Sequence, residues 1–276
     1  MSTSQHHRRG EPPPPPEPLA VPVLDSHTHF DFQDGDVSDG LAAAAAVGVD
    51  RVVQVGTDLP SSRWSVEIAE KHSAVLAAVA LHPNEAPRLD DLDAALAEID
   101  RLAGHPRVRA IGETGLDYFR TGEEGRAAQH TSFAAHIEMA KRHGKALVIH
   151  DRDAHDDVLA VLDEVGAPDT VVLHCFSGDA DFARRCVDRG YVLSFSGTVT
   201  FRNAKPLQEA ARIVPRDQLL VETDAPFLTP VPYRGRPNAP YLIPLTVRFL
   251  AELRGDDLDE LCGAISATGD RVFGPW

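Results

Sequence analysis

The stretch Val23-Leu24-Asp25-Ser26-His27-Thr28-His29 is a short apolar run that ends in two histidines one residue apart. Residues i and i+2 of a β-strand point to the same face of a sheet. An extended His27-x-His29 therefore directs both imidazoles into one volume, where neutral ring nitrogens can bind one divalent ion. Such a pair also occurs at strand ends for structural reasons alone, so the metal site needs support from the rest of the chain.

Length and composition favour one domain. The chain has 276 residues, 43% of them hydrophobic, which suits a single barrel of roughly 250 residues. No apolar run approaches the roughly 20 residues needed to span a bilayer, and the polar N-terminus lacks the apolar core of a signal peptide. The cysteines are odd in number and form no C-x-x-C pair, so a disulfide framework is not expected. We expect a reduced, cytoplasmic protein without membrane contact.

The net charge argues against a broad nucleic-acid-binding surface. The formal charge is −15 at pH 7, whereas such surfaces are normally basic. A small nucleic-acid site is still compatible with this charge, because part of the acidic excess can coordinate metal.

Residues 1–20 are expected to form a disordered, proline-rich leader. The run from Pro12 to Pro16 has no apolar period and is typical of disorder or of a polyproline II helix. His6 and His7 belong to this leader and are excluded from the metal argument. Residues 21–276 are expected to form the folded domain.

Beyond residue 20, one pattern repeats eight times: a short apolar run, a polar residue and a stretch with helical features. The apolar runs are Val21–Leu24, Arg51–Val55, Val75–Leu81, Val108–Ile111, Ala146–Ile149, Thr170–Leu173, Tyr191–Phe195 and Leu219–Val221. They are nearly continuous in apolar residues, as strands buried on both faces of a parallel sheet should be.

Helices are predicted between these runs. The clearest are Gly40–Val47, Leu89–Leu102, Glu123–His143, Val158–Val165 and Phe182–Asp188. Alternating strands and helices predict a parallel sheet. Eight units in one domain favour an α/β fold of the closed (β/α)8 TIM-barrel type over an open doubly wound sheet. No G-x-G-x-x-G follows the first strand, which weakens the dinucleotide-binding alternative.

The residues just past the strands are the decisive observation. In a (β/α)8 barrel the carboxyl ends of the strands converge on one mouth, where active sites lie. The residues expected to meet there are His27, His29, His82, Glu113, His150, His174 and Asp224. The other histidines of the predicted domain fall on helices or loops and are expected to be exposed or to cap helices: His72, His105, His130, His136, His143 and His155.

These residues lie in motifs that resemble the TatD-type metal-dependent deoxyribonucleases, a branch of the amidohydrolase superfamily. Seven motifs occur in the family's order: Asp25–His29, Leu81–Pro83, Ile111–Tyr118, Val148–Ala154, His174–Gly178, Glu222–Leu228 and Arg234–Asn238. Two positions depart from the family pattern. Asp151 replaces the more usual small polar residue, which bears on metal or substrate preference, and Thr268–Phe273 looks like a shortened form of the usual ending.

Both the residue chemistry and the resemblance imply two divalent metal ions. The expected ligands are His27, His29 and Asp224 for one ion, His150 and His174 for the other, and Glu113 as a bridge between them. A water between two such ions becomes a nucleophile at pH 7, because its pKa is lowered towards neutrality. Asp224 could accept its proton, so Asp224 and Glu113 are the expected catalytic carboxylates. Histidine ligands suit zinc, manganese, nickel or cobalt, whereas the resemblance implies magnesium, so the identity of the ions stays open.

Weaker candidates surround this site. Substrate binding is expected of His82, Arg152, Arg234 and Arg236, because guanidinium groups match phosphate oxygens and His82 could bond a phosphate or be structural. Glu222 and Asp117 are expected to orient metal ligands. Tyr118 and Phe119 could stack on a base or simply pack over the mouth.

Three functions are compatible with this site. The favoured one is metal-dependent hydrolysis of DNA phosphodiester bonds, on single strands or at ends, with no obligate protein partner. The alternative is hydrolysis of an amide, ester or lactone of a small molecule or aminoacyl-nucleic acid, because such a site also activates water towards carbonyl carbon. Many amidohydrolases bridge their metals with a carboxylated lysine, whereas the fourth strand here supplies Glu113, which favours the nuclease branch. A non-catalytic binding protein is disfavoured because the ligand set is complete.

Overall fold

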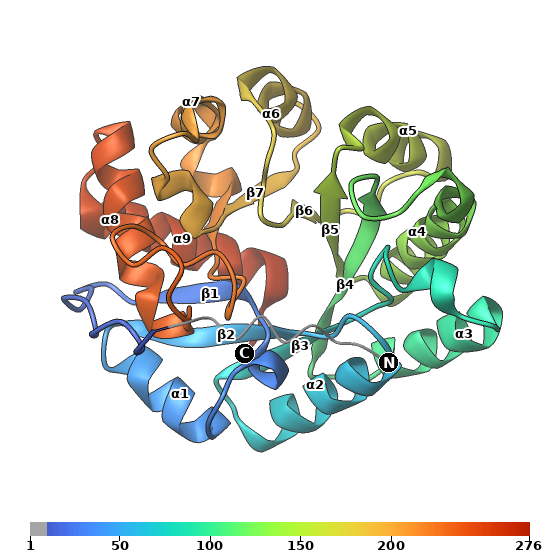
Figure 1. Cartoon of the computed structure of the whole chain (residues 1–276), viewed down its shortest axis with the longest axis horizontal. Coiled ribbons are helices and arrows are strands. Elements are labelled where there is room, and N and C mark those ends of the chain that lie inside the picture. Colours follow the sequence, from blue (N-terminus) through green and yellow to red (C-terminus); the bar gives the residue numbers. More distant parts are fainter. Residues whose placement is uncertain (1–9) are drawn as a thin grey trace.

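Eight parallel strands pair in chain order and form a nearly closed barrel in the computed structural model, which describes residues 10–276 (Figure 1). The strands are β1 Val23–Thr28, β2 Val49–Val55, β3 Val75–Val79, β4 Val108–Asp117, β5 Ala146–Arg152, β6 Val171–Leu173, β7 Val192–Phe195 and β8 Leu219–Val221. All eight predicted runs overlap these strands, and the expected (β/α)8 barrel is confirmed.

The helices form a ring outside the strands (Figure 1). They are α1 Val37–Ala45, α2 Leu59–Lys71, α3 Leu92–Ala103, α4 Glu123–His143, α5 His155–Val165, α6 Ala180–Val187, α7 Lys205–Ile213, α8 Ile243–Arg254 and α9 Leu258–Phe273. Short 3-10 turns are Phe30–Phe32, Ala86–Arg88, Gly197–Thr200, Arg216–Gln218 and Pro240–Leu242. Some of the many acidic residues cap helices: aspartate side chains accept hydrogen bonds from the first backbone N–H groups of α1, α2, α3, α6 and α9.

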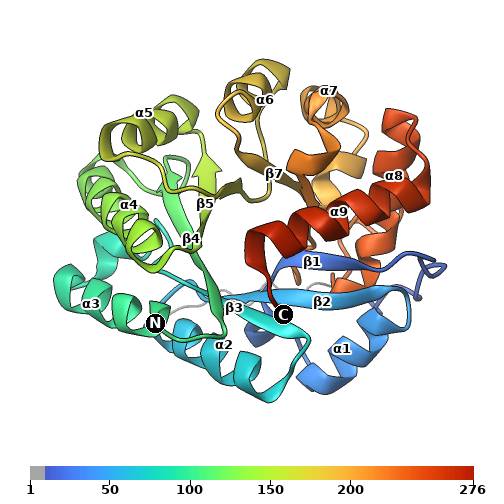
Figure 2. The same cartoon turned by 180° about the vertical axis from the view of Figure 1, so that it is seen from behind.

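The core consists of the strands and the inner faces of the helices. Every residue of β3, β6, β7 and β8 is buried, as expected for strands covered on both sides. The C-terminal helix α9 packs against β1, and Figure 2 shows it in front of the strands. A Cβ atom at Gly269 would lie 2.5 Å from a Leu24 methyl carbon, so a larger residue there would force the buried Leu24 side chain to shift.

The seam between β1 and β8 closes the barrel in a different way from the other strand pairs. Within the described residues no continuous ladder joins these strands; a single parallel bridge connects Thr28 with Ala225. The Asp25 carboxylate accepts hydrogen bonds from the Thr223 backbone N–H at 2.9 Å and from the Thr223 hydroxyl. Burial raises the pKa of Asp25 to about 7, although these Thr223 bonds act to lower it.

The expected leader is described only in part, because residues 1–9, with His6 and His7, lie outside the described residues. Residues 10–20 contain no helix or strand and lie against the barrel. Arg236 donates to the carbonyls of Glu11 and Pro12, and Leu19 is buried in the core. The domain boundary expected after residue 20 stays a prediction. No helix within residues 10–276 is long and apolar enough to cross a membrane.

Candidate metal centre

Four histidines and two carboxylates from five strands or strand ends meet at the carboxyl mouth of the barrel. They are His27 on β1, His29 directly after it, Glu113 on β4, His150 on β5, His174 after β6, and Asp224 after β8. β1 continues to Thr28 and β4 to Asp117, beyond the predicted ends, so His27 and Glu113 lie within strands rather than past them. The backbone therefore fixes the direction of both side chains.

The first donor group joins the two ends of the sheet. His27 Nε2 lies 3.2 Å from His29 Nε2, and His29 Nε2 lies 3.4 Å from Asp224 Oδ1. The Asp224 backbone has φ +52°, in the left-handed region that aspartate tolerates better than most residues. Its N–H donates to the His27 carbonyl at 2.9 Å, which fixes the carboxylate beside β1.

Glu113 lies between this group and the remaining histidines. Its Oε2 is 3.5 Å from His27 Nε2, and its Oε1 is 2.7 Å from His150 Nδ1 and 2.9 Å from His174 Nε2. One carboxylate thus offers one oxygen to each side, which is the geometry that a bridging ligand needs. A glycine two residues after Glu113 allows β4 to pack closely against β5. Gly115 has φ +133°, and a Cβ there would lie 2.1 Å from the His150 carbonyl oxygen.

His82 belongs to the same cluster. Its Nε2 lies 3.3 Å from Glu113 Oε1, and its ring centroid is 4.6 Å from that of His150. Donor atoms of His82, Glu113 and His150 lie within 4.8 Å of one another, as do those of His27, Glu113 and His174, and of His27, His29 and Asp224. His82 therefore has the geometry of a metal ligand as well as that of the predicted phosphate contact.

A second layer of polar groups orients the histidines. Glu222 Oε1 lies 3.1 Å from His174 Nδ1 and also accepts the Cys175 backbone N–H at 2.8 Å. Asp117 Oδ2 lies 3.3 Å from His150 Nε2, and the Val55 carbonyl lies 3.0 Å from His29 Nδ1. Glu222 and Asp117 thus have the contacts predicted for residues that orient metal ligands.

Opposite charges control the protonation of this cluster. Burial acts to raise the pKa of Glu113, yet the surrounding histidines, with His174 first, hold it well below its usual range. Burial likewise opposes the charged form of Asp224, whose pKa is nevertheless lowered by His29. The pKa of His29 rises to about 9 because Asp224 and Glu113 outweigh burial. Both carboxylates are therefore ionised at neutral pH and need cationic partners.

The donor set fits divalent metal. Imidazole nitrogens and carboxylate oxygens converge at short range, and one or two divalent cations can be bound by all of them together. His27 Nδ1 is buried and, among the described atoms, has no hydrogen-bond partner. Burial and the neighbouring His174 lower the pKa of His27, which keeps its ring neutral as a ligand requires.

The three predicted phosphate-binding arginines have different surroundings. The Arg152 guanidinium lies 3.9 Å from the Phe119 ring centroid, and that of Arg234 lies 4.4 Å from the Phe201 ring centroid. Arg236, in contrast, donates to the backbone of the N-terminal segment. The structure thus leaves Arg152 and Arg234 without a carboxylate partner among the described residues, while Arg236 has a structural contact.

The prediction that His136 is exposed or caps a helix is wrong. His136 is fully buried in α4, where its Nε2 accepts the Leu81 backbone N–H at 3.2 Å. Its Nδ1 lies 2.6 Å from the Ser132 carbonyl and must therefore carry the proton. Asp151, the departure from the family pattern, bonds His155 Nδ1 at 2.7 Å. Sequence reasoning also missed Asn84, which donates to Asp117 at 2.8 Å.

Comparisons with known proteins show the family to which this barrel belongs. The family model "TatD related DNase" matches residues 24–274. The chain is 52% identical over 260 residues to an uncharacterized metal-dependent hydrolase TatD of Mycobacterium tuberculosis, covering 91% of this chain and 98% of that protein. It is 39% identical to the uncharacterized metal-dependent hydrolase YcfH of Escherichia coli K12, covering 91% and 95%. The crystal structure of the TatD homologue YJJV from Escherichia coli K12 superposes with a TM-score of 0.86, at 30% identity, covering 92% and 98%.

The family match spans every strand except the first residue of β1, and every residue of the donor cluster lies within it. The two relatives named above are matched over almost their whole length, so the chain resembles the complete hydrolase barrel rather than one motif. The barrel, the cluster of donors at its mouth and these matches identify the chain as a metal-dependent hydrolase of the TatD-related DNase family.

Proposed function

We propose that this chain is a deoxyribonuclease that hydrolyses phosphodiester bonds of DNA, on single strands or at ends, in the cytoplasm. The observation that carries the proposal is the Glu113 carboxylate between two groups of histidines, an arrangement suited to two neighbouring divalent ions. When bound, such ions activate a water and neutralise charge on the phosphoryl oxygens. Magnesium, manganese and zinc are all candidates.

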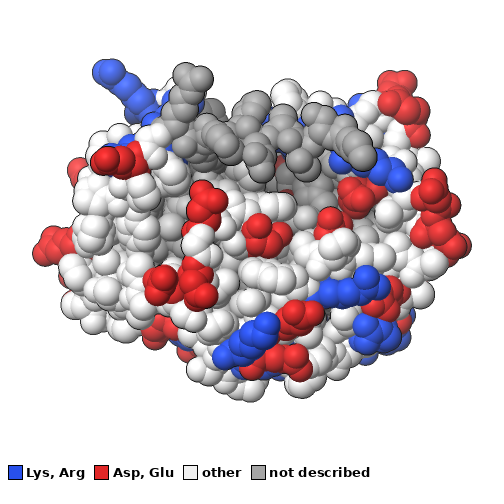
Figure 3. All heavy atoms as spheres, turned by 60° about the horizontal axis from the view of Figure 1, so that its bottom comes forward, with Lys and Arg blue, Asp and Glu red and all other residues white. Residues whose placement is uncertain are grey.

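Unpaired arginines at the mouth support a polyanionic substrate. Several arginines away from the mouth pair with carboxylates, as in Arg63 with Glu98 and Arg142 with Asp100, and Figure 3 shows acidic side chains scattered over one face. Arg120, Arg152, Arg202 and Arg234 lie at or after the carboxyl ends of strands, and none of them has a carboxylate within 4.0 Å among residues 10–276. Such loops surround the mouth of a (β/α)8 barrel, so these cations give an acidic protein a local attraction for phosphate.

Exposed aromatic rings at the same mouth support a substrate with flat bases. Phe119, after β4, is 63% exposed, and Phe32, after β1, is 52% exposed. The Phe32 ring centroid lies 5.5 Å from that of His29 and 6.2 Å from that of Phe227. Base stacking on such rings contributes about 1–3 kcal/mol per base, independent of sequence.

The protein groups have separable tasks in this reaction. Asp224 is ionised at neutral pH and can accept the proton of the attacking water, since its carboxylate faces His27 and His29 in the donor cluster. Arg152 and Arg234 bind phosphates that flank the scissile bond, and Phe119 stacks on a neighbouring base. Glu222 and Asp117 hold His174 and His150 in orientation.

The net charge of −15 favours a second candidate, a hydrolase of neutral amides, esters or lactones. The same donor cluster would activate water for attack on carbonyl carbon. A long DNA footprint conflicts with this charge, so the deoxyribonuclease proposal requires a short one of about 2–4 phosphates.

A salt titration tests this requirement. An Asp224→Asn variant with bound metal should bind a short single strand with a slope of log affinity against log salt of about −1.4 to −2.8, because each phosphate contributes about −0.7. Arg152→Gln and Arg234→Gln, made in that background, should weaken binding for all sequences and flatten the slope by less than about one unit. Arg142→Gln, which removes the same charge away from the mouth, is the matched control. Absence of DNA binding by the metal-loaded protein would support the carbonyl hydrolase instead.

A further inference from the structure

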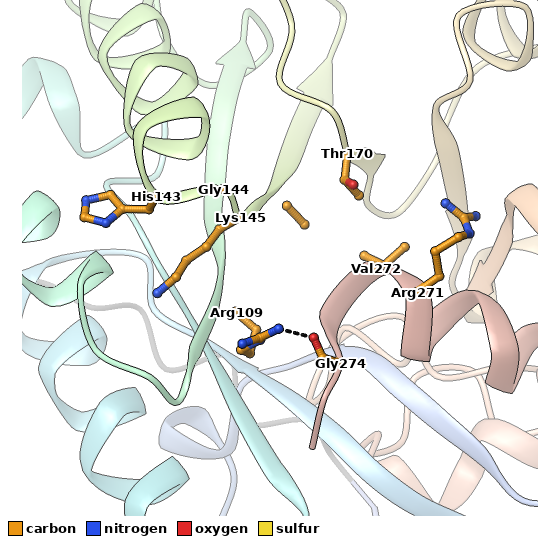
Figure 4. Close-up of a pocket in the computed structure, with 9 residues that line it drawn as sticks. Arg109, His143, Gly144, Lys145, Thr170, Arg271, Val272 and Gly274 are labelled. Carbon is orange, nitrogen blue, oxygen red and sulfur yellow. Dashed lines mark hydrogen bonds between the residues drawn. The ribbon is translucent and has the colours of Figure 1, made fainter.

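A basic cavity lies at the opposite end of the barrel from the metal centre, at the amino ends of the strands. It has a volume of about 190 Å³ and is lined by residues from the starts of β4 and β5, the segment before β6 and the end of α9. Figure 4 shows Arg109, Lys145, Thr170, Arg271 and Gly274 around it. None of these residues belongs to the catalytic mouth.

The cations of this cavity are fixed by neutral groups. Arg109 Nε donates to the Phe273 carbonyl at 2.8 Å, and its guanidinium also bonds the Gly274 carbonyl. Lys145 Nζ donates to the carbonyls of Ala103 and His105, at 3.0 Å in the latter case. These carbonyls lie in or near the last turns of α3 and α9, where cations interact favourably with the helix dipole.

Carbonyls orient these cations but do not cancel their charge. Among the described residues, Arg109, Lys145 and Arg271 have no carboxylate partner within 4.0 Å, although the chain carries an excess of acids. The pKa of Lys145 is lowered to about 8 by burial and by the nearby positive charge of Arg109. The positive charges of Lys145 and Arg109 therefore repel each other, and a bound anion would offset this repulsion.

Residues that line this cavity also carry donors without a hydrogen-bond partner among the described residues. The Arg109 Nη1 and the Arg271 Nε and Nη1 groups take no part in any hydrogen bond among the described residues, since Arg271 uses only Nη2, for the Asp217 carbonyl. The Thr170 hydroxyl is likewise without a hydrogen bond within the described chain. An adjoining cavity of about 300 Å³ shares Gly144, Lys145 and Thr170, and Asp169 is the acidic residue that lines it.

We propose that this cavity is a binding site for a small phosphate-type oxyanion, either free phosphate or the phosphate group of a monoester. Arg109 and Arg271 supply guanidinium donors, Lys145 supplies an ammonium and Thr170 a hydroxyl. A volume of 190 Å³ corresponds to roughly six water molecules at about 30 Å³ each, which accommodates a phosphate with part of its hydration shell. The bound anion links β4, β5 and α9 at the end of the barrel where contacts stabilise the fold.

A titration followed by NMR tests this site separately from the metal centre. Inorganic phosphate is added to the full-length, magnesium-loaded protein at constant ionic strength, and the amide resonances of Gly144 and Thr170 are followed. The location of these amides separates the cavity from any phosphate bound at the mouth. The proposal expects saturable shifts at both amides, whereas sodium chloride at the same ionic strength produces none.

Variants give the result that would overturn the proposal. Lys145→Gln and Arg271→Gln should each weaken phosphate binding roughly tenfold, because each removes a charged hydrogen-bond donor. Arg142→Gln, which removes a nearby exposed charge paired with Asp100, should leave it unchanged. Arg271 is exposed on α9, so its variant keeps the test valid if Lys145→Gln does not fold. Absent shifts at Gly144 and Thr170, or equal weakening by Arg142→Gln, contradict the proposal.

A parallel titration with a nucleoside monophosphate identifies the source of the anion. Tighter binding than inorganic phosphate, with the same dependence on Lys145 and Arg271, assigns the site to a phosphate monoester. Weaker binding with that dependence assigns it to free phosphate. Shifts that do not depend on either residue contradict the site for both ligands.

Discussion

Asp25 and Thr223 form a side-chain contact between β1 and the segment after β8, with the Asp25 carboxylate accepting both the backbone N–H and the hydroxyl of Thr223. The residues that follow each of them in the chain are metal-ligand candidates, His27 and His29 on one side and Asp224 on the other. The geometry of this donor group therefore depends on a hydrogen-bonded seam rather than on a strand ladder.

Asp25→Ala should lower both stability and metal affinity. It leaves the buried N–H groups of Thr223 and His27 without their acceptor, and each such loss costs about 1–3 kcal/mol. Denaturant unfolding and metal titration measure the two effects. Thr223→Val keeps the backbone bond to Asp25 and removes the two bonds of the hydroxyl, to Asp25 and from the Ala225 N–H, so it should cost less in both. A folded Asp25→Ala protein with unchanged metal affinity would show that the seam does not set the ligand geometry.

His29→Ala and Glu113→Ala should each abolish hydrolysis and leave the barrel folded. Both side chains face the donor cluster rather than the apolar core, so their loss removes ligands without opening a core cavity. Turnover at saturating metal, together with circular dichroism, measures this. His155→Ala removes a histidine that bonds Asp151 outside the cluster and is the control. Near wild-type turnover in either folded variant would contradict the assignment.

Asp224→Asn separates the two tasks of this carboxylate. The amide keeps an oxygen that can act as a ligand but cannot take up a proton, so turnover should fall by roughly 10²–10⁴. Metal content, measured on the purified variant, should fall much less. Parallel loss of turnover and of metal would mean that Asp224 acts only as a ligand.

The sequence alone predicts the barrel and its donor cluster because both depend on local patterns. Buried parallel strands appear in the sequence as apolar runs, and in a (β/α)8 barrel the carboxyl ends of all strands lie at the same mouth. The helix Glu123–His143 is predicted with its observed bounds, since its C-terminus is marked by Gly144 in a left-handed conformation.

Other features depend on contacts that no local pattern contains. The pattern predicts a helix between β2 and β3 but not the bounds of α2, since Ser62 and Ser65 are polar residues on its buried face and bond the backbone there. A polar histidine on a helix is expected to be exposed. His136 is buried because it bonds Leu81, which is 55 residues away in sequence and cannot be recognised as its partner from the local pattern. The contact of Arg236 with Glu11 spans 225 residues, so its structural role could not be read from its own surroundings.

His136 should make the protein sensitive to mild acid. Burial lowers its pKa to about 4, whereas the unfolded chain binds the proton near pH 6.5. The unfolded state therefore holds more protons between these values, and stability falls as pH drops from about 6.5 to 4, by up to about 1.4 kcal/mol per pH unit. Urea unfolding of metal-free protein across this range should show a shallower pH slope for His136→Gln. An identical slope in the variant would contradict a neutral, buried His136.

The most direct test of the deoxyribonuclease proposal is hydrolysis by metal-stripped protein to which single ions are returned. Single-stranded DNA and a panel of amide, ester and lactone substrates are assayed with magnesium, manganese or zinc, alongside Glu113→Ala as the inactive control. We expect DNA cleavage that is absent without metal, restored by at least one ion and absent in Glu113→Ala. Turnover of a carbonyl substrate with no cleavage of DNA under any ion would contradict it.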